Sequence, residues 1–64
     1  MFEVEYFNVY RMSWVTAFFS SQEETEDFVK ANKNLWVDFS VKHDGAYVDL
    51  AEFLFNGNVI EMNA

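Results

Sequence analysis

The sequence has no cysteine and no proline, and only two glycines and four basic residues among its 64 positions. Without cysteine, neither a disulfide nor a cysteine metal site can stabilise so short a chain. Both glycines follow Asx residues, in Asp44-Gly45 and Asn56-Gly57, and are predicted to lie in turns, which leaves no glycine-rich loop for phosphate. No apolar run is long enough to span a membrane, and the first residues lack the basic and apolar segments of a signal peptide. We therefore expect a soluble cytoplasmic protein with a single compact domain over residues 1–64.

The excess of acidic residues limits the kinds of partner. Eleven acidic residues against four basic ones give a formal net charge of −7. Nucleic acids and anionic membranes bind to basic surfaces, so this charge argues against direct binding to either. It favours a basic partner protein, or it serves only to keep a chain with 20% aromatic residues in solution.

Residues 35–55 predict a β-hairpin around Asp44-Gly45. The odd positions of 35–41 are all apolar and the even positions are mixed, which is typical of a strand with one face in a core. Asp-Gly suits a two-residue type I′ turn, because both of its central residues need positive φ. A turn of that length fixes the register and places Lys42 opposite Tyr47.

Two strands are predicted before this hairpin. Residues 2–8 alternate between apolar and acidic side chains at the start, as a strand with one buried face does. Residues 12–19 are largely apolar at both odd and even positions. That composition is typical of a central strand with both faces covered.

Between the strand pairs, the sequence predicts a helix that ends at about Asn32. A capping box can start it at either of two serines, Ser20 with Glu23 or Ser21 with Glu24. One stripe at helical spacing is expected to pack on the sheet: Thr25, Phe28, Val29 and Asn32. Acidic residues fill the first half and lysines follow at the end, an order that suits the helix dipole.

These elements predict an α+β fold, a small single-layer antiparallel sheet (ββαββ) with one helix packed on one face. Asn56-Gly57 predicts a further turn that pairs 51–55 with 59–62 as a short fifth strand. That register sets Glu52 opposite Glu61, so a different register or partial pairing stays open. One helix covers one face, and the other face is expected to stay open as an interaction site.

The predicted partner-binding residues are aromatic anchors and carboxylates. The anchors are expected at the centre of the open face: Trp36, Tyr47 and Phe53. Charge contacts to Lys and Arg are expected from six acids: Asp38, Asp49, Glu23, Glu24, Glu26 and Asp27. The same acids, together with others, are also compatible with imitation of a phosphate backbone. We expect no enzyme, because the only histidine, His43, is predicted to be a solvated turn residue, and we expect no metal and no cofactor.

In size, charge and compactness the chain is similar to the small early proteins of bacteriophages, including anti-restriction and anti-CRISPR inhibitors. No motif matches a named family, so no residue role is transferred. The resemblance implies an inhibitor that occludes a basic nucleic-acid-binding or catalytic surface of a larger protein, in the host cytoplasm if the source is viral. The alternative is a structural homodimer or other homo-oligomer, or an accessory subunit, that uses its open aromatic face for self-association.

Overall fold

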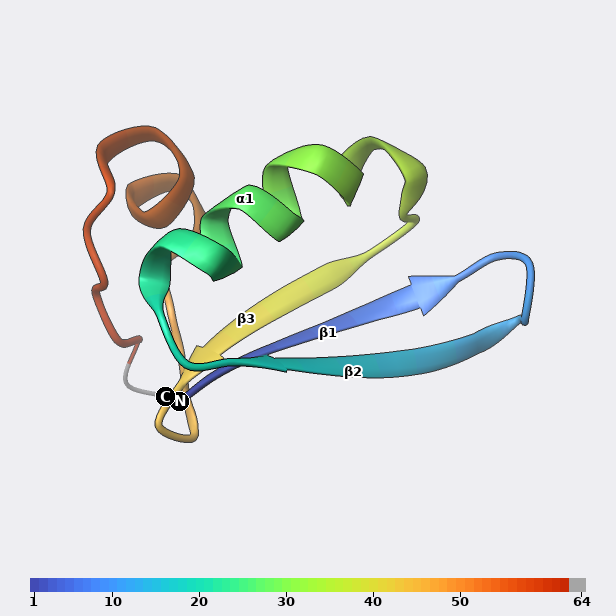
Figure 1. Ribbon diagram of the computed structural model, residues 1–64, viewed down its shortest axis with the longest axis horizontal. Coiled ribbons are helices and arrows are strands. Elements are labelled where there is room, and N and C mark those ends of the chain that lie inside the picture. Colours follow the sequence, from blue (N-terminus) through green and yellow to red (C-terminus); the bar gives the residue numbers. More distant parts are fainter. Residues whose placement is uncertain (63–64) are drawn as a thin grey trace.

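The computed structural model describes residues 1–62, which form a four-stranded antiparallel sheet with strand order β2-β1-β3-β4. Helix α1 lies across one face of this sheet (Figure 1). None of the helices within these residues is long and apolar enough to cross a membrane. The predicted α+β fold is confirmed. The elements in chain order are β1 (Phe2–Asn8), β2 (Ser13–Phe19), α1 (Gln22–Asn32), the 3₁₀ turn η1 (Lys33–Leu35), β3 (Phe39–His43), β4 (Ala46–Tyr47) and the π-helical turn η2 (Glu52–Asn56).

A small apolar cluster joins α1 to the central strands. Val4 of β1 lies opposite Val41 of β3, and both side chains are turned toward the helix and buried. Val29 of α1 and the fully buried Phe53 of η2 pack with them, and Phe2 and Val48 complete the cluster. Alternation along β1 therefore places Val4 in the core and its acidic neighbours on the opposite face.

Helix α1 begins at the second of the two candidate serines. The Ser21 hydroxyl accepts the Glu24 N–H at 3.2 Å and donates to the Glu24 carboxylate at 3.0 Å. Thr25 and Val29 are completely buried against the sheet, as the predicted stripe requires. Near the end of the helix, the Asn32 side chain donates to the Phe28 carbonyl at 2.8 Å.

The hairpin prediction is confirmed at the turn. Asp44 and Gly45 have φ values of 49° and 87°, so both occupy the region that a type I′ turn requires. Lys42 pairs with Tyr47, as predicted. The hairpin is much shorter than predicted. Its last backbone hydrogen bond joins the Val48 N–H to the Val41 carbonyl.

After Val48 the chain turns into a helical segment instead of continuing as a strand. The Asp49 carboxylate accepts the Glu52 N–H at 3.1 Å, which caps the first turn. Gly57 ends the segment in the left-handed region at φ 69°, and its N–H bonds to the Glu52 carbonyl. The predicted hairpin at Asn56-Gly57 is therefore wrong, because the dipeptide ends a helical turn.

The segment 60–62 pairs with the chain around β4, not with residues 51–55. The Asp49 N–H donates to the Ile60 carbonyl at 2.9 Å, and the Met62 N–H donates to the Tyr47 carbonyl at 2.7 Å. Glu61 forms a bridge to Val48 and does not face Glu52, so the predicted fifth-strand register is wrong. The segment shields the outer side of β4.

The prediction that the second strand is central and covered on both faces is also wrong. Strand β2 is the outer strand and pairs within residues 1–62 only with β1. Its face turned away from α1 exposes 53% of Trp14 and 61% of Phe18. An apolar pattern on both faces predicts a strand, but it does not determine whether that strand is central or at the edge of the sheet.

We predict that Phe53→Ala lowers the free energy of unfolding by about 3–5 kcal/mol, because it opens a cavity in the cluster. Urea denaturation followed by circular dichroism measures this change. Phe55→Ala is the matched control, since Phe55 lies in the same turn and is 83% exposed. The control is expected to change stability by less than about 0.5 kcal/mol. Equal losses in the two variants would contradict the position of Phe53 in the core.

Candidate interaction surface

The sheet face turned away from α1 combines aromatic rings with carboxylates. Successive side chains of a strand point to opposite faces, so the register of the strands determines which residues lie on this face. Its longest row runs across all four strands, from Phe18 through Glu3 and Lys42 to Tyr47. The residues of this open face are Glu3, Glu5, Phe7, Trp14, Thr16, Phe18, Ser40, Lys42 and Tyr47.

Aromatic rings lie on both sides of the acidic middle of the open face. On the β2 side, Phe7 and Trp14 meet edge to face with ring centroids 5.6 Å apart. On the β4 side, the Lys42 ammonium lies 4.8 Å from the centre of the Tyr47 ring, a cation–π contact. Glu3 stands between these sides, next to Lys42 in the register.

Two of the three predicted anchors do not lie on the open face. Trp36 stacks on Tyr6 beneath α1, with centroids 4.5 Å apart, and Phe53 is fully buried. The strand alternation does not apply to either, because Trp36 follows a 3₁₀ turn and Phe53 belongs to a helical turn. Tyr47 is on the open face and half exposed. The aromatic residues that the prediction missed are Phe7, Trp14 and Phe18, and the alternation of β2 already carried the signal for the last two.

Asp38 and Asp49 do not face each other across the hairpin. Asp38 precedes β3 and accepts the Phe39 N–H at 2.9 Å. Asp49 follows β4 and caps the next helical turn. The ladder of the hairpin ends before it reaches either residue, so the hairpin does not bring these two predicted acids together.

The four predicted acids of α1 lie at the start of the helix. Glu24 is bound by Ser21, and Glu26 lies 3.9 Å from Lys30. Glu23 and Asp27 are exposed, with no hydrogen bond or salt bridge to another described residue. Two of the four are therefore available for contacts with a partner.

Segments distant in the sequence add further carboxylates at the same end of the molecule. The first half of α1, the β3–β4 turn, and η2 with the segment after it lie at that end (Figure 1). Gln22 at the start of α1 donates to the Gly57 carbonyl at 2.7 Å, which ties two of these segments together. We call this group the acidic end: Glu23, Glu24, Glu26, Asp27, Asp44, Glu52 and Glu61.

The β3–β4 turn is held by ionic contacts. The N-terminal ammonium of Met1 donates to Asp44 at 2.7 Å, and this hydrogen bond is the main cause that lowers the pKa of Asp44 below its usual 3.8. His43 is half-buried in β3 and not a solvated turn residue as predicted, with its ring centroid 4.6 Å from that of Phe2. Its Nδ1 lies 3.2 Å from the Glu61 carboxylate. These contacts join the turn to both terminal segments.

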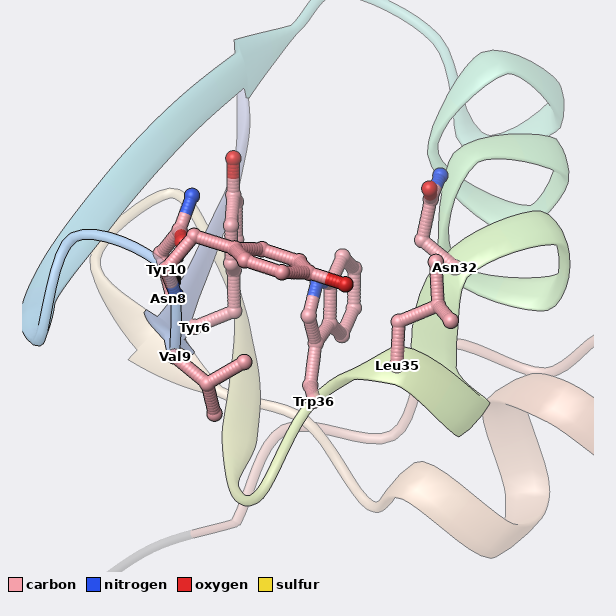
Figure 2. Close-up of a pocket in the computed structure, with 7 residues that line it drawn as sticks. All are labelled: Tyr6, Asn8, Val9, Tyr10, Asn32, Leu35 and Trp36. Atoms are coloured by element: carbon pink, nitrogen blue, oxygen red, sulfur yellow. Dashed lines mark hydrogen bonds between the residues drawn. The ribbon is translucent and has the colours of Figure 1, made fainter.

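The opposite end of the molecule carries bases and a small aromatic pocket. Arg11 lies in the β1–β2 turn and Lys33 follows the last residue of α1, whereas Lys30 reaches back to Glu26 of the acidic end. The pocket has a volume of about 180 Å³ and no charged side chain in its lining: Tyr6, Asn8, Val9, Tyr10, Asn32, Leu35 and Trp36. In Figure 2 the aromatic rings stand on one side, and Asn32 and Leu35 on the other. Such walls suit a planar or apolar group.

In residues 1–62, no three His, Asp or Glu side chains are placed to hold a metal ion.

No protein-family model matches the chain, and no characterised protein or solved structure is significantly similar to it. The geometry of the surface is therefore the basis for any functional argument.

We predict that the ion pair at Asp44 stabilises the fold at neutral pH and is lost in acid. The lowered pKa means that the folded state favours the charged carboxylate, so the contribution is complete above pH 3.8 and disappears as the pH falls through the lower folded-state value. Asp44→Asn keeps a residue that tolerates positive φ and removes the charge. The wild type is expected to be more stable than this variant at about pH 6, and the difference should vanish at about pH 2. A difference that persisted at the lower pH would contradict this role.

Proposed function

We propose that the protein is a small binding module that docks its acidic end on a basic, nucleic-acid-binding or catalytic surface of a larger protein and blocks that surface. The gathering of carboxylates supports this proposal. Seven of the eleven acidic residues belong to the acidic end, and they come from α1, the β3–β4 turn, η2 and the C-terminal segment. Of the four basic residues, Arg11 and Lys33 lie toward the other end, Lys30 contacts Glu26, and Lys42 lies two residues before Asp44. A charge that only solubilises the chain needs no such gathering.

The contacts of individual acids suggest which of them bind the partner first. Glu23 and Asp27 are exposed and lie four residues apart, so they occupy one side of the helix. Lys and Arg side chains of a partner can approach both at once. Opposite charges on the two surfaces accelerate association and select against acidic partners.

The open face supplies the apolar part of such an interface. Trp14, Phe18 and Tyr47 are all at least half exposed, and aromatic residues are enriched at protein interfaces. Aromatic contacts beside an acidic region fit a surface on the partner that normally holds nucleic acid. We therefore propose an inhibitor of the anti-restriction or anti-CRISPR kind that acts in the cytoplasm, with imitation of DNA charge as one mechanism of occlusion.

We predict that Glu23→Lys combined with Asp27→Lys abolishes inhibition while the wild type inhibits. The assay measures DNA cleavage by purified restriction and CRISPR nucleases, with and without the protein, at about 50 and 200 mM salt. Wild-type inhibition is expected to be strong at low salt and weaker at high salt, because the docking charges are screened.

The control compares the single variants Asp27→Lys and Asp38→Lys, which change the net charge equally, because Asp38 lies outside both the acidic end and the open face. Asp38→Lys is expected to retain most of the inhibition. Equal losses in the two single variants would show that total charge, and not the acidic end, is responsible. Inhibition that neither variant nor salt affects would rule out charge-driven docking.

A further inference from the structure

Strand β2 has an unprotected outer edge. It pairs with β1 through seven consecutive residues without a bulge, and within residues 1–62 nothing pairs with its other side. The other edge of the sheet is shielded by the segment 60–62. Folded proteins usually block exposed edges with charges, proline, bulges or very short strands. Strand β2 has none of these, because residues 12–22 include no ionisable residue and no proline.

We propose that β2 pairs antiparallel with β2 of a second copy of this chain, about a twofold axis at Thr16. The pairing joins two four-stranded sheets into one continuous sheet. An axis of this kind uses the same surface on both copies, as most protein dimers do. The inference does not rest on the proposed function, because it concerns self-association alone.

The register about Thr16 matches the exposed side chains of β2. It pairs all seven strand residues, and on the open face it sets Trp14 of each copy opposite Phe18 of the other. Both rings are more than half exposed in the single chain, so the pairing covers apolar surface as well as backbone groups. Aromatic cross-strand pairs stabilise antiparallel sheets. Thr16 meets its own counterpart at the axis.

Charge favours a second copy as the occupant of this edge. The antiparallel register brings Arg11 of each copy to the end of the ladder where α1 of the other copy begins with Glu23 and Glu24. Opposite charges therefore meet at both ends of the paired strands, while the uncharged strands meet between them. Two copies with a net charge of −7 each would repel one another if most other parts of their surfaces met.

The dimer would place the open faces of both copies on the same side of the joint sheet. This follows because a twofold axis through antiparallel neighbouring strands is perpendicular to the sheet. The acidic ends lie at the Phe19 end of each β2 strand, so they point in opposite directions along the paired strands. The assembly would then present two acidic ends to separate partner molecules.

We predict that the wild type sediments as a dimer at micromolar concentrations and that Thr16→Lys raises the dimer dissociation constant by roughly ten-fold or more. The lysines of the two copies would face each other at the axis, where like charges oppose pairing. Ser40→Lys is the matched control, because Ser40 and Thr16 lie in the same row of the open face on either side of Glu5. The control makes the same charge change two strands away and is expected to leave the dimer intact.

A cross-linking experiment tests the axis without depending on a destabilising variant. Since the chain has no cysteine, Thr16→Cys introduces a single thiol, and antiparallel neighbours in this register bring the two Cα atoms within disulfide range. Mild oxidation is expected to convert Thr16→Cys to a covalent dimer and to leave Ser40→Cys mostly monomeric. A monomeric wild type at about 100 μM, or a dimer unaffected by Thr16→Lys, would overturn the proposal, as would equal cross-linking of the two cysteine variants.

Discussion

The rest of the structure depends on the burial of one small cluster: Phe2, Val4, Val29, Val41, Val48 and Phe53. Its members come from β1, α1, β3, η2 and the position after β4, so a single contact region fixes the helix, the two inner strands and the C-terminal turn. Strand β2 contributes no fully buried side chain and is held by its ladder with β1. A chain this short fills one core on one face of its sheet, and the exposed outer strand and open face follow from that limit.

Local signals in the sequence predicted the parts of the fold that local interactions determine. The first strand, the capped helix and the type I′ turn each depend on residues close together in the chain, and the structure confirms all three. Beyond Val48, two patterns compete. Val48 and Leu50 continue the alternation of a strand, but Leu50, Phe53 and Leu54 also fit one face of a helix, and the Asp49 cap decides for the helix. The position of β2 at the edge depends on the strand order, and the local sequence pattern of a strand does not reveal that order.

The candidate site also has a part that the local sequence predicts and a part that only the fold creates. The acids of α1 are visible as a cluster in the sequence, whereas Asp44 and Glu61 join them only through the topology. The contact between Met1 and Asp44 spans 43 positions, and the contact between Gln22 and Gly57 spans 35. The misplaced anchors have a similar cause, since the face of Trp36 was inferred from a strand that begins only at Phe39. Composition therefore reveals the excess of acidic residues, and only the fold shows which of their carboxylates lie close together.

The two tryptophans occupy such different surroundings that the unlabelled chain carries two separate optical reporters. Trp36 is partly buried beneath α1, where it stacks on Tyr6, and Trp14 lies half exposed on the outer strand. An aqueous quencher therefore reaches the emission of Trp14 well before that of Trp36. Loss of the folded interior changes the Trp36 signal, while anything that settles on the outer strand changes the Trp14 signal. Single replacement of either tryptophan by phenylalanine would separate the two signals in solution.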